Sequence, residues 1–169
     1  MTSSLHIAII GGGAAGFFAA IEAKRCNPDA DITIFEKNNA MLAKVAITGG
    51  GRCNLTNSFA LISDARQAYP RGHKLMKRLL KRFSHTDAYD WFEREGVPLV
   101  TQSDECVFPA SQDSQSIISC LTRLAVRLGV RQRCGHRLTD ISRNADSTLH
   151  LTFANGFEAD FHRVAVTTG

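Results

Sequence analysis

The sequence predicts an α/β fold: a Rossmann-like parallel sheet with helices, plus a small antiparallel β-meander. The first observation is an apolar run at Leu5–Ile10, a glycine-rich turn, a helical pattern at Ala14–Cys26 and a second apolar strand at Asp31–Glu36. These elements together have the usual size of a βαβ unit, about thirty residues. The second observation is the Asn155–Gly156 dipeptide between two alternating segments, which is a strong hairpin signal. The third is a closing apolar strand at Arg163–Thr167.

Composition limits the class of protein. The chain has 169 residues, 44% hydrophobic and 21% charged, which is typical of a globular domain. A net charge of +4 is too small to require a nucleic-acid partner, so we do not expect one. Five scattered cysteines without a C-x-x-C pair indicate a reducing cytoplasm rather than a disulfide framework. The scattered histidines predict no metal site, and three glycines interrupt the uncharged run Ile7–Ile21, which argues against a signal peptide or membrane span.

The remaining elements follow from periodicity and caps. Residues 38–57 are expected to be irregular. The helix at Lys74–Phe83 should be amphipathic, with Leu75, Met76, Leu79, Leu80 and Phe83 on one face and its cations on the other. Ser84 and Asp87 form a capping-box pattern for the next helix, which Gly96 ends. Further expected elements are a helix at Ser111–Leu128, a strand at Val130–Cys134 and the β-meander within 136–162.

The glycine loop carries the first functional signal. The segment Gly11–Gly16 fits G-x-G-x-x-G between a strand and a helix, a pattern typical of dinucleotide-binding proteins. Gly11 permits the turn, Gly13 lets the backbone approach a pyrophosphate, and Gly16 lets the helix pack closely on the strand. The N–H groups of the first helical turn, at Ala14 and Ala15, favour an anion.

A carboxylate and a second glycine segment extend this signal. Glu36 ends the second strand twenty positions after Gly16 and can accept hydrogen bonds from ribose hydroxyls. It argues against a 2′-phosphate, although Lys37 lies beside it. The segment Gly49–Asn57 (GGGRCNLTN) offers bare backbone and fixed donors to a ligand. A simple NAD dehydrogenase has no use for such a loop after its ribose acid, whereas a flavoprotein does.

Five segments together resemble a bacterial family of NAD(P)/FAD-dependent oxidoreductases that includes aminoacetone oxidase and bile-acid dehydro-reductase flavoproteins. They are IIGGGAAG (9–16), EKN (36–38), KVAITGGGRCNLTN (44–57), VFPASQ (107–112) and VAVTTG (164–169). GGGRCN is highly specific, VFP is moderately so, and the first and last segments are shared by many flavoproteins. Glu105 and Cys106 depart from the Gly-Arg expected before VFP in many relatives, so the resemblance assigns no substrate role there.

The resemblance implies FAD as the cofactor, with NAD(P)H as a candidate electron donor and a small-molecule substrate. It places Gly11, Gly13, Gly16, Glu36 and Lys37 on the ADP half. It places Gly51, Arg52, Cys53 and Asn54 along the rest of the cofactor, and Thr168 and Gly169 in a segment that returns toward FAD. It also implies that 1–169 is the FAD-binding, N-terminal part of a longer flavoprotein, with little turnover alone. No catalytic residue is assigned.

Several alternatives stay open. Cys53 could be redox-active, but a packed cysteine is favoured because dithiol chemistry needs a second cysteine close by, and the next one along the chain is Cys106. Arg52 could bind the pyrophosphate, polarise the flavin, or form only a surface salt bridge. The basic face between Arg71 and Arg82 permits an FAD-dependent tRNA-modifying enzyme, although no aromatic residues are interleaved there. A non-catalytic nucleotide-binding module is the third hypothesis.

Overall fold

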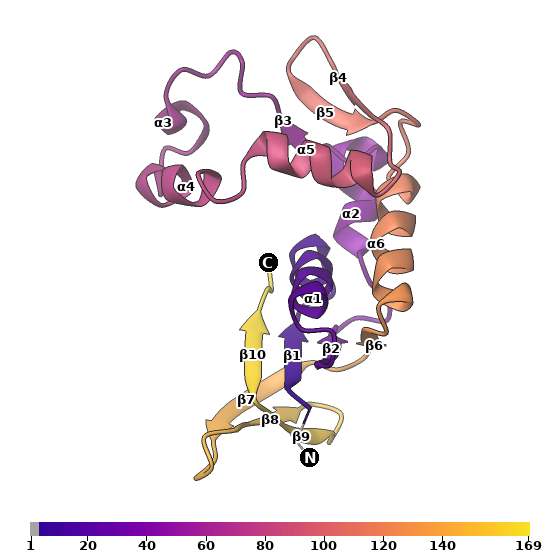
Figure 1. The fold of residues 1–169 in the computed structure, drawn as a ribbon, viewed down its shortest axis with the longest axis vertical. Coiled ribbons are helices and arrows are strands. Elements are labelled where there is room, and N and C mark those ends of the chain that lie inside the picture. Colours follow the sequence, from indigo (N-terminus) through magenta and orange to yellow (C-terminus); the bar gives the residue numbers. More distant parts are fainter. Residues whose placement is uncertain (1–3) are drawn as a thin grey trace. The chain divides into compact units, whose positions relative to one another are not determined.

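The computed structural model describes residues 4–169 and divides into two compact units. Unit 1 comprises residues up to 45 together with 121–169, and unit 2 comprises 46–120. Helix α6 (Gln115–Arg127) contains one boundary between them, and helix α2 (Ala43–Ile47) contains the other (Figure 1).

Unit 1 is built on a parallel four-stranded sheet in the order β10-β1-β2-β6. The strands are β1 (His6–Ile10), β2 (Asp31–Phe35), β6 (Arg131–Arg133) and β10 (Arg163–Val166). The two central strands are almost wholly buried, as expected of a parallel sheet covered on both faces. The predicted Rossmann-like sheet is therefore confirmed, and the closing strand β10 pairs in parallel with β1.

Helix α1 (Ala14–Cys26) connects β1 to β2 and has the predicted bounds. Its residues Phe17, Ala20 and Ile21 are fully buried, whereas Lys24 directs its Nζ to the carbonyl of Ala30, 2.6 Å away. The apolar positions recur at helical spacing, so the helix covers the sheet with one stripe.

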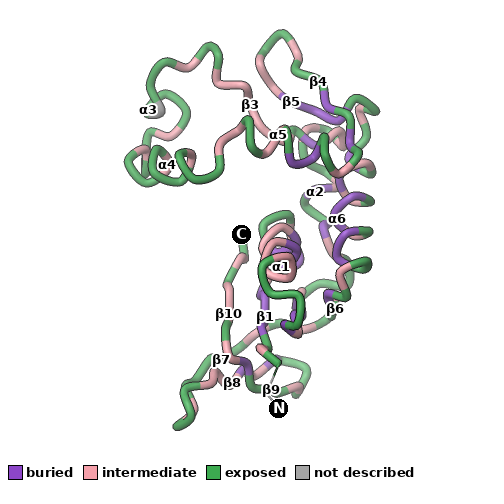
Figure 2. The backbone as a smooth tube through the Cα atoms, in the orientation of Figure 1, coloured by how far each residue is buried: buried purple, intermediate pink, exposed green. Residues whose placement is uncertain are grey.

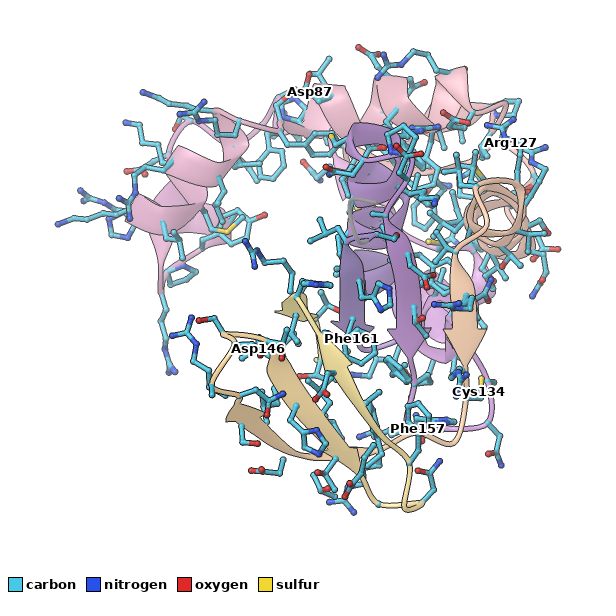
Figure 3. The ribbon with its side chains drawn as sticks, turned by 60° about the horizontal axis from the view of Figure 1, so that its bottom comes forward. Asp87, Arg127, Cys134, Asp146, Phe157 and Phe161 are labelled. Atoms are coloured by element: carbon cyan, nitrogen blue, oxygen red, sulfur yellow. The ribbon has the colours of Figure 1, made fainter. Side chains whose placement is uncertain are left out.

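The β-meander packs against the same sheet. It consists of β7 (Leu138–Arg143), β8 (Leu149–Phe153) and β9 (Glu158–Phe161), all antiparallel. Its buried side chains and those of the parallel strands form one core cluster, with Phe35 and Phe153 ring centroids 4.6 Å apart. Figure 3 labels Phe161 and Phe157, which belong to this aromatic cluster or pack against it. The predicted hairpin turn is confirmed, with Gly156 in the left-handed region at φ 81°.

Unit 2 contains a second antiparallel sheet that the sequence analysis did not predict. Its order is β3-β5-β4, formed by β3 (Thr56–Asn57), β4 (Leu99–Thr101) and β5 (Cys106–Pro109). The segment expected to be irregular, 38–57, contains α2, the short 3₁₀ helix η1 (Thr48–Gly51) and β3. These elements are two to five residues long, too short to produce a periodic signal.

Two helices of unit 2 test the predictions from caps and periodicity. Helix α5 (His85–Arg94) has the predicted capping box between Ser84 and Asp87. Helix α6 begins at Gln115, four residues after the predicted start, and Figure 2 shows buried positions along it. Local caps therefore predicted helix existence well and helix boundaries less well.

The amphipathic basic helix is present, but its apolar face is partly exposed. Helix α4 (His73–Leu80) has no buried residue, and Leu75, Leu79 and Phe83 are 51%, 50% and 40% exposed. Its partner α3 (Ala65–Ala68) is only four residues long, too short to cover an apolar stripe. An amphipathic pattern predicts that a helix has an apolar face, but it does not predict what covers that face.

Candidate cofactor-binding site

The glycine loop of unit 1 is fixed between the ends of three parallel strands. Its first residue, Gly11, donates its N–H to the Phe35 carbonyl of β2 over 2.8 Å. A Cβ on Gly16 would overlap the Gly11 carbonyl oxygen, so helix α1 starts directly against the loop. Close packing of helix on strand, the role expected for this glycine, is what its surroundings require.

Gly13 has the opposite surroundings. It is the N-cap of α1, with φ −88° and ψ −173°, and an added Cβ would meet no described protein atom within 4 Å. The helix has no side-chain cap and no acidic residue in its first turn. The uncapped N–H groups, together with the positive end of the helix dipole, form a favourable position for an anion beside bare backbone.

Glu36 lies beside this loop at the end of β2. Its Oε2 accepts the N–H of Gly12 over 2.9 Å, and its Oε1 accepts the backbone and side-chain N–H of Asn38 over 2.9 and 2.8 Å. A carboxylate offers about four lone-pair positions, so it retains capacity for a hydroxyl donor. The half-buried carboxylate is thus held in a fixed orientation while still able to accept a further bond.

Gly12 is a residue that the pattern left unassigned. A Cβ there would overlap the Met41 sulfur and the Glu36 side chain. Its carbonyl also accepts the N–H of Leu42 over 2.7 Å, which ties the chain after β2 to the glycine loop. The G-x-G-x-x-G pattern leaves this position variable, and only the structure shows that Met41 and Glu36 leave room for nothing larger.

The end of the chain approaches the same loop. Thr167 donates its Oγ1–H toward the carbonyls of Ile10 and Gly11, 3.0 and 3.2 Å away. Thr168 and Gly169, both predicted site residues, are exposed beyond β10. Thr167 was not among the predicted site residues, although it belongs to the VAVTTG segment that contains Thr168 and Gly169.

Lys37 and Lys44 supply the positive charge of this region. Lys37 is exposed just beyond Glu36. Lys44 is also exposed, and a Cβ built on Gly169 would lie 3.4 Å from its Nζ. The structure therefore gathers the predicted residues of unit 1 at the carboxyl ends of β1, β2 and β10, where ligands bind in open α/β sheets.

The second glycine segment folds within unit 2 as a left-handed turn. Gly49, Gly50 and Gly51 have φ of 57°, 67° and 85°. Only glycine adopts three such conformations in succession at low cost. A Cβ on Gly49 would lie 2.7 Å from the Asn54 nitrogen, so the turn is also closely packed.

Arg52 follows this turn and is held by three contacts. Its guanidinium carbon lies 4.2 Å from the centroid of the Phe108 ring. Its Nε donates to the Gly49 carbonyl over 3.2 Å and its Nη1 to Gln112 Oε1 over 3.3 Å. The contacts that fix Arg52 are thus a cation–π contact and neutral hydrogen bonds, unlike the surface salt bridge considered from sequence.

Cys53 and Asn54 differ in exposure. Cys53 is buried, and burial raises the pKa of its thiol, which opposes the thiolate form that redox chemistry needs. This environment favours the packed cysteine. Asn54 is exposed and leaves its amide available to a ligand.

A family model decides the classification of this chain. The HI0933-like protein Rossmann domain matches residues 5–169. The chain belongs to the HI0933-like family. The match agrees with the predicted resemblance and identifies the chain as an FAD/NAD(P)-binding Rossmann domain related to flavoprotein oxidoreductases.

The HI0933-like domain is similar to a named reductase in sequence and to solved structures in fold. It is 32% identical over 165 residues to 3-dehydro-bile acid delta(4,6)-reductase of Clostridium scindens, covering 97% of this chain and 39% of that relative. The fold is similar to that of 3-ketosteroid-delta4-(5alpha)-dehydrogenase from Rhodococcus jostii RHA1, with a TM-score of 0.67 and 16% identity. This match covers 98% of this chain and 46% of that one. The fold is also similar to that of the FrdA chain of Escherichia coli quinol fumarate reductase, with a TM-score of 0.67 and 19% identity. This match covers 99% of this chain and 33% of that one.

The described residues, 4–169, contain neither a metal-ligand cluster nor a membrane-spanning helix. No group of three or more histidine, cysteine or acidic residues in this range could hold a metal ion. Within the same range, every helix is too short or too polar to cross a membrane.

Proposed function

We propose that this HI0933-like domain binds FAD through the ADP half, using the glycine loop and Glu36 of unit 1. The observation that carries the proposal is Gly13, whose missing side chain leaves open space at an uncapped helix N-terminus. The FAD pyrophosphate is a dianion, and N–H groups fixed at a helix N-terminus bind such a group without further reorganisation.

Glu36 supplies the contact to the adenosine ribose. Its orientation is set by Gly12 and Asn38, and a ribose hydroxyl would donate to the remaining lone pair. A 2′-phosphate at that position would instead meet a carboxylate, and like charges repel. The proposal therefore favours FAD over an NADP-like dinucleotide at this loop.

Unit 2 contributes to the remainder of the cofactor in this proposal, through Gly51, Arg52, Cys53 and Asn54. Support comes from the resemblance of GGGRCN to flavoproteins and from a left-handed glycine turn that offers backbone groups to a ligand. Cys53 is buried and Arg52 presents a cation. Bound FAD would supply the hydride chemistry, while these residues bind and orient it.

For the protein as a whole we propose hydride transfer between FAD and NAD(P)H or an organic substrate. The related reductase from Clostridium scindens supports an oxidoreductase. The first test is the absorbance spectrum of the purified protein, followed by identification of the small molecule released on heating. A flavin spectrum and released FAD are expected, whereas a chain that neither retains nor binds FAD would refute the proposal.

An FAD-dependent tRNA-modifying enzyme is the second candidate. The observation that favours it is the basic face of α4 and the residues that follow, where Lys74, Lys77, Arg78, Lys81 and Arg82 are all exposed. Phosphate contacts by these cations would make RNA affinity fall steeply with salt. Protection of α4 by tRNA, lost on replacing the five cations by glutamine, would support this candidate. Absence of protection at low salt would reject it.

A further inference from the structure

The segment from Val107 to Ser114 contacts the second glycine segment at both of its ends. The Leu55 N–H donates to the Val107 carbonyl over 2.8 Å, and the Ser114 N–H donates to the Gly51 carbonyl over 2.8 Å. Ser114 and Val107 are both buried. Two motifs about sixty residues apart in sequence, GGGRCN and VFPASQ, therefore form one packed structure within unit 2.

Two side chains of this segment contact the Arg52 guanidinium. The buried ring of Phe108 lies 4.2 Å from the guanidinium carbon, and Gln112 Oε1 accepts from Nη1 over 3.3 Å. The Gly49 carbonyl holds the Nε side. A ring face and two acceptors in different directions restrict the plane of the guanidinium as well as its position.

Gln112 is itself held in an uncommon conformation. Its φ is 56°, in the left-handed region that non-glycine residues seldom adopt. Its backbone N–H and its side-chain Nε2 both donate to the Pro109 carbonyl, over 2.9 and 3.1 Å. Gln102 donates to the same Oε1 that Arg52 uses, over 3.2 Å. Because the bond to Pro109 uses Gln112 Nε2 as its donor, the other amide atom, Oε1, faces the guanidinium.

The guanidinium keeps further donors. It has five N–H groups, of which Gly49 and Gln112 take one each. The two N–H groups of Nη2 and the other N–H group of Nη1 remain, and together they form a fork suited to an oxygen acceptor. Because Gln112 is neutral, it orients Arg52 without cancelling the positive charge.

We propose that Gln112 is a positioning residue that orients Arg52 so that its remaining N–H groups meet an electron-rich oxygen of FAD. The inference rests on the proposed function, because it assumes that FAD is the ligand. The oxygen could belong to the pyrophosphate or to the isoalloxazine ring, and both are acceptors of the same kind.

The test is a double-mutant cycle on FAD and ADP affinity, measured with the whole chain. Gln112→Gly removes the amide at a backbone conformation that glycine adopts readily, so the variant should fold. We expect Arg52→Ala to weaken FAD binding at least about tenfold, since it removes a charged hydrogen bond. Gln112→Gly should weaken it several-fold, and adding it to Arg52→Ala should cause no further loss.

Two variants separate positioning from simple stability. Gln112→Glu can still accept from Arg52 but cancels its charge, so FAD affinity should again fall although the variant is folded. Glu105→Gly is the matched control, because Glu105 also has a left-handed backbone, φ 65°, in the same unit. It leaves the contacts of Arg52 intact and should retain the wild-type FAD affinity.

The outcomes are distinct. Loss of both FAD and ADP affinity in Gln112→Gly identifies a pyrophosphate oxygen, and loss of FAD affinity alone identifies the isoalloxazine ring. The inference would be overturned if the losses of FAD affinity in the Arg52 and Gln112 variants multiplied in the double variant. It would also be overturned if Gln112→Gly kept the wild-type FAD affinity. In both cases the proposed function would stand. A wild-type chain that binds no FAD would overturn the proposed function and this inference with it.

Discussion

Replacing Gly13 by valine separates cofactor binding from folding. The backbone at Gly13 has φ −88° and ψ −173°, which any residue can adopt, and the added Cβ would meet no described atom within 4 Å. The described protein atoms therefore leave room for the Cβ of the new side chain. In the proposed complex, however, the same volume is occupied by the FAD pyrophosphate.

The two effects differ in size. Helix N-caps and glycine substitutions at permitted conformations change the free energy of unfolding by about 1 kcal/mol or less. A hydrogen bond from a backbone N–H to a charged phosphate contributes about 1.5–3 kcal/mol. Losing a single such bond therefore predicts about a tenfold to hundredfold increase in the Kd for FAD.

The assay is titration with FAD, followed by flavin fluorescence quenching, alongside a thermal melt of each protein. The matched control is Ala154→Val, which adds a branched side chain at an exposed position of the same unit. We expect the control to bind FAD normally and Gly13→Val to bind weakly while remaining folded. Equal FAD affinity in a folded Gly13→Val protein would refute the phosphate-loop reasoning.

Three further predictions concern unit 1. Glu36→Ala should cost about 1–3 kcal/mol of FAD binding, because ribose hydroxyls lose their acceptor; an unchanged FAD affinity would contradict the proposed ribose contact. Gly16→Ala should lower the melting temperature even without FAD, since its Cβ would overlap the Gly11 carbonyl oxygen; an unchanged melt would show that the loop can shift. His150 Nδ1 lies 2.7 Å from Asp160 Oδ1, and this hydrogen bond raises the pKa of His150 and lowers that of Asp160. A histidine with a raised pKa stabilises the fold at pH values below its unfolded-state pKa, and this stabilisation is lost as pH rises through its folded-state pKa. His150→Gln should therefore lower the melting temperature more at about pH 6 than at about pH 8.5. Equal losses at both pH values would contradict this.

The sequence predicted the sheet and loop of unit 1 because their signals are local. A strand, the turn Gly11–Gly16, a helix and Glu36 follow each other without interruption, and each has its own pattern. The Asn155–Gly156 turn likewise fixed the meander, since φ above zero at Gly156 suits a hairpin. Where the pattern and the tertiary structure agree in this way, prediction from sequence succeeds.

The contacts between distant segments could not be predicted in the same way. Arg52 and Gln112 are sixty positions apart, and no periodicity links them. Thr167 holds the first glycine loop from the other end of the chain. The exposed face of α4 had the pattern of a buried helix, because periodicity reports an apolar face and not its partner.

A comparison of FAD with FMN tests the central proposal most directly. Both contain the isoalloxazine ring, but only FAD has the ADP half that the glycine loop and Glu36 are proposed to bind. Titration calorimetry of the whole chain should give tight FAD binding, competition by ADP, and weak or undetectable FMN binding. FMN binding as tight as FAD, or FAD binding that ADP does not displace, would contradict the account.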